Sequence, residues 1–119
     1  MIKIKILFFL LVYCCYFLTS ATINSQNINR FDENNERTGV WKKYYSNKRI
    51  RYVGQFEKGK EIGVFKFYHI TSSEYPITVK KFFKNSDSVF VQFFTTTGRI
   101  ESEGFLKVRE RVGKWKYFY

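Results

Sequence analysis

The side chains that most often perform enzymatic chemistry are scarce in this sequence of 119 residues. His69 is the only histidine, so a zinc site would lack a second histidine ligand, and a Cys–His nucleophile pair would depend on the two cysteines near the N-terminus. Cys14 and Cys15 both lie in an apolar N-terminal run. Glu101 and Glu103 stand two residues apart on one strand, whereas glycosidase carboxylates flank the scissile bond from opposite sides. We therefore expect no catalytic residue, no metal site and no cofactor site.

The remaining candidate chemistry is binding through lysines that alternate with aromatic residues. The chain has 21 Lys and Arg against 10 Asp and Glu, together with 14 Phe, 9 Tyr and 2 Trp. A basic surface attracts polyanions such as phosphate headgroups, acidic glycans and nucleic acid. AT-rich codons favour Lys, Asn, Ile, Phe and Tyr, so part of this composition could reflect the genome. The composition indicates a binding surface without naming its ligand.

Residues 1–21 have the features of a secretory signal peptide. Lysines precede an apolar run of 13 residues at positions 6–18, and the small residues Thr19-Ser20-Ala21 follow. This run is shorter than the roughly 20 residues that span a bilayer as a helix. We expect cleavage, and hence a secreted, periplasmic or cell-envelope protein. The alternatives are a membrane anchor formed by residues 6–18 and a lipidated cysteine. Cleavage would remove both cysteines and lower the net charge from +11 to +9.

The rest of the chain divides into a polar segment and a strand-rich segment. Residues 22–36 are rich in asparagine, which is typical of a linker, and could include a first strand around positions 28–31. Residues 37–119 contain short apolar-aromatic runs separated by turn residues, without helical spacing. This pattern predicts an all-β domain, with strands near 40–45 and 50–56 around a turn at 46–48.

One short phrase recurs along the strand-rich segment. It reads GVWKKY at 39–44, GVFKFY at 63–68 and GKWKYF at 113–118, with SVFVQF at 88–93 as a degenerate copy. The segment NKRIRYVGQF at 47–56 also matches TGRIESEGFL at 97–106 without a gap. A period of about 25 residues predicts stacked hairpins, none of which buries its apolar face alone. The expected units are 37–60, 61–85, 86–110 and 111–119, in an open-ended, solenoid-like, single-layer antiparallel meander.

The residues that define this repeat are Gly39, Trp41, Gly54, Phe56, Gly59, Gly63, Phe65, Phe90, Gly104, Gly113 and Trp115. The glycines before the aromatic residues are expected where the backbone approaches closely or adopts a positive φ.

The pattern resembles the MORN-repeat variant of bacterial proteins, whose unit reads approximately G-x-W-x-x-Y, an N-G turn, E-G-x-Y/F and N-G-K-x-x-G. The resemblance covers most of residues 37–119. It departs at Lys48 and Asn85, where glycine is usual, and at Ser88 and Phe90, which replace Gly and Trp. The resemblance implies stacked MORN-like hairpins and an exported role or an antitoxin-like partnership. The signal peptide argues against a cytoplasmic antitoxin.

Strand alternation predicts two different sheet faces. The face of Trp41 and Phe65, with Phe90 and Trp115, is expected to be the better buried. The candidate binding face comprises Lys42, Tyr44, Lys66, Tyr68, Phe93, Lys116 and Phe118. Two interpretations remain open for it: an ordinary solvated surface, or a platform for an anionic envelope or membrane component. Nucleic acid is not expected, because an exported protein rarely meets it.

The segment 113–118 is expected to form an edge strand, and exposed edges tend to pair with other strands. The second functional hypothesis is therefore a protein–protein partner, either antitoxin-like or an oligomeric scaffold that self-associates through this edge. Both hypotheses describe an exported, non-enzymatic binding or scaffold protein.

Overall fold

The structure is a computed structural model that describes residues 27–119. The predicted signal peptide at 1–21, the alternative anchor at 6–18 and the first linker residues lie outside the described residues. The strands are β1 (Arg30–Phe31), β2 (Arg37–Tyr44), β3 (Ile50–Glu57), β4 (Lys60–His69), β5 (Ser72–Phe82), β6 (Ser88–Phe94), β7 (Ile100–Lys107) and β8 (Glu110–Tyr117).

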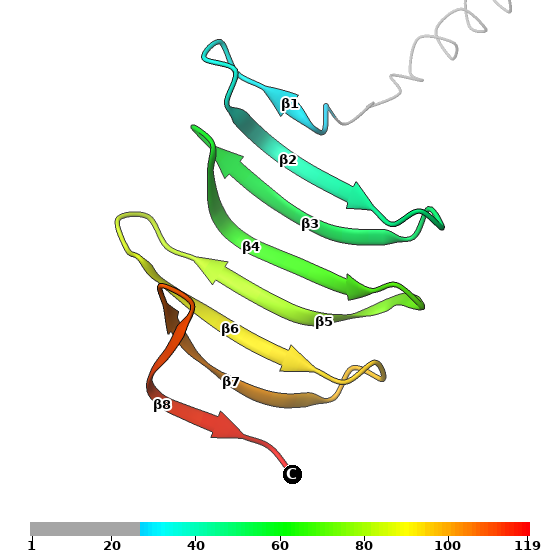
Figure 1. Cartoon of the computed structure of the whole chain (residues 1–119), viewed down its shortest axis with the longest axis vertical. Helices are drawn as coiled ribbons and strands as arrows, with labels where there is room; N and C mark the ends of the chain where they lie inside the picture. Colours follow the sequence, from blue (N-terminus) through cyan, green and yellow to red (C-terminus); the bar gives the residue numbers. More distant parts are fainter. Residues whose placement is uncertain (1–26) are drawn as a thin grey trace, which may run out of the picture.

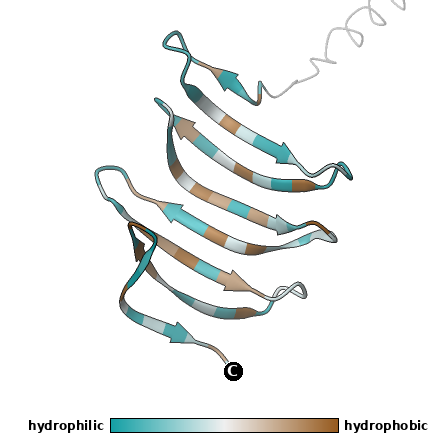
Figure 2. Ribbon diagram, in the orientation of Figure 1, coloured by the Kyte–Doolittle hydropathy of each residue, from teal (hydrophilic) through white to brown (hydrophobic). Residues whose placement is uncertain are grey.

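These eight strands form one open sheet in which every strand is antiparallel to its neighbours in sequence (Figure 1). The predicted all-β, single-layer meander is confirmed. No helix of residues 27–119 is long and apolar enough to cross a membrane. Hydrophobic and hydrophilic residues alternate along many of the strands, which gives the sheet two chemically different faces (Figure 2).

The sheet begins inside the expected linker, within the 28–31 segment where the sequence allows a first strand. Arg30 and Phe31 pair with β2. The side chain of Asn29 behaves like one more peptide group: it accepts a hydrogen bond from Lys42 N at 2.8 Å and donates one to Lys42 O at 3.0 Å. These bonds tie the start of the sheet to β2.

The first and third hairpins have the same register, displaced by 50 residues. Trp41 pairs with Gly54 in the first, and Val91 pairs with Gly104 in the third. The prediction that Phe90 takes the place of Trp41 is therefore wrong by one residue, and Val91 takes it. Because strand side chains alternate, this single displacement moves Phe90 to the opposite face.

Two strands bend where they carry extra residues. Val53 pairs with Lys66 and Gln55 with Ile62, so three residues of β4 lie opposite one residue of β3. The same irregularity occurs in β8, and both strands curve near their starts (Figure 1). Gly63 and Gly113 lie in these bulges with φ of +66° and +68°, a backbone region that favours glycine, as the sequence predicts.

The buried side chains gather on one face, which we call the buried face. Trp41, Phe56 and Phe65 form its main cluster and are 3%, 6% and 3% exposed. Phe56 packs edge-on against both neighbours, with ring centroids 5.9 Å from Trp41 and 5.3 Å from Phe65. Gly54 leaves room for the Phe65 ring, since a Cβ there would lie 2.2 Å from it. Val91 is the fully buried residue of the third hairpin.

Candidate binding face

The three lysines of the predicted binding face lie on the side of the sheet opposite the buried face. The three lysines belong to one row of residues that pair with one another across neighbouring strands. This row runs through Lys42, Val53, Lys66, Val79, Gln92, Glu103 and Lys116. We call this side the lysine face. Glu103 is the one acidic residue in this row, and its carboxylate accepts a hydrogen bond from Gln92 Nε2 at 2.9 Å.

Phe93 does not belong to this face, so its predicted position is wrong. It pairs with Thr78 and Ser102, on the buried face, and its ring stacks on Trp115 with centroids 6.3 Å apart. The cause is the same one-residue displacement that misplaced Phe90. A shift of one position along a strand exchanges the two faces.

The other predicted aromatic residues lie at strand ends. Register shifts separate Tyr44 and Tyr68 from the regular parts of β2 and β4. Tyr44 is 54% exposed, whereas the half-buried Tyr68 accepts a hydrogen bond on its carbonyl from Tyr45 Oη at 2.7 Å. Phe118 follows the end of β8 and is 43% exposed. These rings therefore flank the lysines at one end of the strands.

The aromatic residues that do accompany the lysines were missed by the sequence prediction. The row next to the lysines runs through successive cross-strand partners: Val64, Lys81, Phe90, Phe105 and Val112. Val64, Phe105 and Val112 are 45%, 42% and 36% exposed. Phe83, which is 49% exposed, lies beside Phe105 with ring centroids 6.5 Å apart. We call the apolar residues Val64, Phe83, Phe90, Phe105 and Val112 the apolar row.

Aromatic and cationic groups are in contact within this row. The Phe90 and Phe105 rings meet edge-to-face at 5.2 Å, and Lys81 Nζ lies 5.9 Å from the Phe90 centroid. Lys107 forms an ion pair with Asp87 at 3.7 Å. Contiguous exposed apolar residues rimmed by polar ones often mark interaction sites.

The sequence contained the information needed to place Phe90 in this row. The gapless match of 47–56 to 97–106 has an offset of 50 residues, and the same offset aligns Phe90 with Val40.

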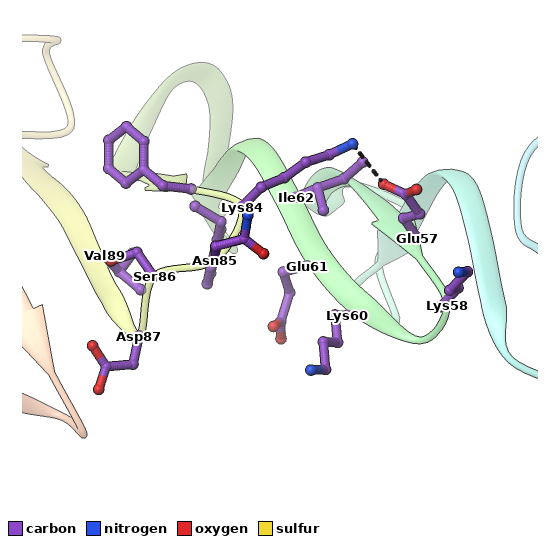
Figure 3. A pocket seen from close by; sticks show the side chains of 12 residues that line it. Glu57, Lys58, Lys60, Glu61, Ile62, Lys84, Asn85, Ser86, Asp87 and Val89 are labelled. Atoms are coloured by element: carbon purple, nitrogen blue, oxygen red, sulfur yellow. Dashed lines mark ion pairs between the residues drawn. The ribbon is translucent and has the colours of Figure 1, made fainter.

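An open groove of about 910 Å³ lies at the hairpin ends, between the β3–β4 turn and the β5–β6 loop (Figure 3). Its lining includes three lysines and three acids: Lys58, Lys60, Lys84, Glu57, Glu61 and Asp87. Lys84 pairs with Glu57 at 3.3 Å. The mixed charges give this groove no preference for one sign of ligand. Ser86, the hydroxyl in the lining, accepts a hydrogen bond from Ser88 N at 3.1 Å.

Of the titratable residues considered for catalysis, Glu103 belongs to the row of the lysine face, whereas His69 lies in a turn at a hairpin end. His69 Nδ1 is 2.8 Å from Thr71 Oγ1 and accepts a hydrogen bond from Thr71 N, in the exposed β4–β5 turn. Within residues 27–119, no three His, Cys, Asp or Glu residues are grouped closely enough to hold a metal ion. The absence of catalytic and cofactor sites stays a prediction.

The chain matches no protein-family model, no curated protein and no solved structure. The resemblance to MORN-repeat variants therefore stays a prediction that rests on the repeated residues. A stacked-hairpin sheet alone does not define a function, so the function is proposed from the binding face.

Proposed function

We propose that this protein is a non-enzymatic binding module of the cell envelope that attaches to anionic membrane surfaces through the lysine face. The observation that carries the proposal is the apolar row, which runs from β4 to β8 beside the row that contains Lys66 and Lys116 and which includes Lys81 among its cross-strand partners. Apolar side chains can enter the boundary between headgroups and acyl chains while nearby lysines meet lipid phosphates.

The expected affinity is modest. Each lysine near an anionic bilayer contributes about 1 kcal/mol, and Lys42, Lys66, Lys81 and Lys116 lie on this face. Burying the exposed halves of Phe83 and Phe105 adds about 1 kcal/mol each. The sum corresponds to a Kd of roughly 10–100 μM, so attachment is reversible and weakens as salt screens the lysines.

Vesicle sedimentation tests this proposal. The protein is mixed with vesicles of phosphatidylcholine alone or of phosphatidylcholine with phosphatidylglycerol, at low and high salt. We expect sedimentation with the anionic vesicles only, and release by salt. The variant Lys42→Gln, Lys66→Gln, Lys116→Gln should lose most of this binding, and Phe83→Ser, Phe105→Ser should weaken it.

A matched control removes the same charge elsewhere: Lys48→Gln, Lys58→Gln, Lys60→Gln changes exposed residues of turns and of a strand start. Circular dichroism should show all variants folded. Equal vesicle binding by the lysine-face variant and the control would refute the proposal, because only net charge would then matter.

The alternative function is a protein–protein partner, antitoxin-like or an oligomeric scaffold. Its support is the β8 edge, since β8 pairs only with β7 among the described strands. A partner protein retained from the envelope fraction through a high-salt wash would favour this alternative. The resemblance to MORN-repeat variants is compatible with either function.

A further inference from the structure

We infer that copies of this chain join head to tail, with β1 of one copy adding to the β8 edge of the next. This contact uses the two ends of the described sheet and not the lysine face, so it is independent of the proposed membrane attachment. It follows from the way in which the repeat packs its own hairpins.

Inside one copy, the junction between the first and second hairpins places an aromatic ring between two others. Phe56 lies between Trp41 and Phe65, with interplanar angles of 75° and 87°. The ring is only 6% exposed as a result. Such edge-to-face pairs add about 0.5–1.5 kcal/mol each beyond the area that they bury.

Phe31 in β1 has the position of Phe56, but only half of its contacts. It pairs with Arg37 at the start of β2 just as Phe56 pairs with Glu61 at the start of β4. Its ring meets Trp41 edge-on at 5.2 Å and 82°. The other side of the ring faces no described strand, and Phe31 is 54% exposed.

Trp115 in β8 is the ring that would complete the surroundings of Phe31. It occupies the position of Trp41 and Phe65, and it packs over Gly104 as Phe65 packs over Gly54. Phe93 stacks on it from within the sheet, and Arg111 lies 4.5 Å from its ring centroid. Within residues 27–119 no strand follows β8, so no ring lies beside Trp115 as Phe56 lies beside Trp41.

When β1 of a second copy adds to β8 of the first, Phe31 of the second copy comes to lie between Trp115 of the first copy and Trp41 of the second. This is the arrangement in which Phe56 lies between Trp41 and Phe65 within one copy. The strand directions agree as well. β8 is antiparallel to β7 and β1 is antiparallel to β2, so an antiparallel β8–β1 pair continues the alternation. Open sheet edges are templates for this kind of addition.

The charges at the two ends are complementary. The β1–β2 turn carries Asp32, Glu33 and Glu36, and it lies over the β3–β4 turn, where Gly59 N donates a hydrogen bond to Arg37 O at 3.1 Å. In the joined sheet, the same acidic turn would lie two strand spacings, roughly 10 Å, from the β7–β8 turn. That turn and its flanks carry the three basic residues Lys107, Arg109 and Arg111 and one acid, Glu110.

Such a contact joins two different surfaces, so it repeats from copy to copy and yields a linear or ring-shaped assembly instead of a closed two-fold dimer. The average mass of the chain in solution should therefore rise continuously with concentration for a linear assembly and level off at the mass of the ring for a closed one.

Sedimentation velocity of the full chain over a range of concentrations tests this assembly. The single variants Glu33→Lys and Arg109→Glu change exposed turn residues at opposite ends of the sheet. We expect each to raise the concentration needed for association about fivefold, the upper range for one surface charge pair. The double variant should recover association, because its reversed charges again attract. Glu74→Lys, exposed and away from both ends, is the matched control and should behave as the unchanged chain.

A monomer at every concentration would overturn the inference. So would association that neither single variant weakens, which would point to contacts elsewhere in the chain, including the apolar N-terminal run. Binding of the single variants to anionic vesicles is expected to persist, so failure of the assembly and failure of the membrane proposal can be told apart.

Discussion

Gly54→Ala adds only one methyl group, but we expect it to destabilise this protein strongly. A Cβ at Gly54 would lie 2.2 Å from Phe65 Cδ1 and Cε1 and 2.5 Å from Cγ, whereas ordinary contacts fall between 3.4 and 4 Å. The ring must therefore retreat by more than an ångström. Phe65 cannot do so freely, because Phe56 and Phe82 meet it edge-on at 5.3 and 5.1 Å.

The magnitude follows from what Phe65 loses. Overpacking a close-packed site costs typically 1–3 kcal/mol. If the ring leaves its site, it loses about 1.5–3 kcal/mol of burial and the two edge-to-face contacts. Replacing glycine within a strand returns about 0.5–1 kcal/mol, because alanine restricts the unfolded chain. We expect the free energy of unfolding to fall by roughly 2–3 kcal/mol and the Tm by about 10–20 °C.

Urea unfolding followed by tryptophan fluorescence and circular dichroism measures this loss, with Gly104→Ala as the matched comparison. A Cβ at Gly104 would lie 2.4 Å from the Trp115 ring, a similar overlap, but Trp115 is half-buried on the edge strand, where one hydrogen bond to Phe105 O and the Phe93 ring hold it less tightly than two edge-on rings hold Phe65. Gly104→Ala should therefore cost only about 1 kcal/mol. In a Phe65→Ala background, Gly54→Ala should become neutral or stabilising. Equal losses at the two glycines, or an undiminished loss without Phe65, would refute the steric reasoning.

Two further predictions concern the turn before β8 and the start of the sheet. Val108 and Arg109 have φ of +50° and +66°, the pattern of a type I′ turn. Val108→Asn with Arg109→Gly should raise the free energy of unfolding by about 1–2 kcal/mol in urea, and no gain would exclude backbone strain there. Asn29→Ala removes both side-chain hydrogen bonds to Lys42 and should cost about 1–2 kcal/mol. Asn29→Asp should be similarly destabilised, because it places a carboxylate against the Lys42 carbonyl; full stability in either variant would show that β1 does not depend on this bridge.

The repeated phrase was sufficient to predict the architecture, because its physical causes are local. Turn residues, alternating apolar positions and glycines before aromatic residues recur with the hairpins that they produce. The close approach at Gly54 and Gly104 and the positive φ at Gly63 and Gly113 are the structural reasons for that recurrence. Each glycine makes room for a ring of the next strand or permits the bulge that bends it.

The candidate binding face was harder to predict, because its composition depends on register. A fixed period of 25 aligns Ser88 with the repeat glycine, whereas cross-strand pairing aligns Val89. β6 pairs with β5 without the extra residues that β4 and β8 carry, so a sequence offset of one residue accumulates there. The offset exchanged the faces of Phe90 and Phe93, and with them the exposed and buried aromatic residues. A sheet with two different faces amplifies the smallest alignment error.

The second and third hairpins depart from the repeat in a correlated way, at β5 and β6, and these two strands pair without a register shift. Lys80 stands where the other units have Gly54 and Gly104, and it pairs with both Phe65 and Val91. The larger side chain at the glycine position coincides with the smaller Val91 at the aromatic position, so volume moves across the strands with little net change. Lys80 Nζ lies 5.3 Å from the Phe67 centroid, so the ammonium lies near an aromatic face. With Val91 buried in the aromatic position, the third hairpin presents Phe90 on the opposite face, beside Phe105, where the proposed membrane attachment needs it.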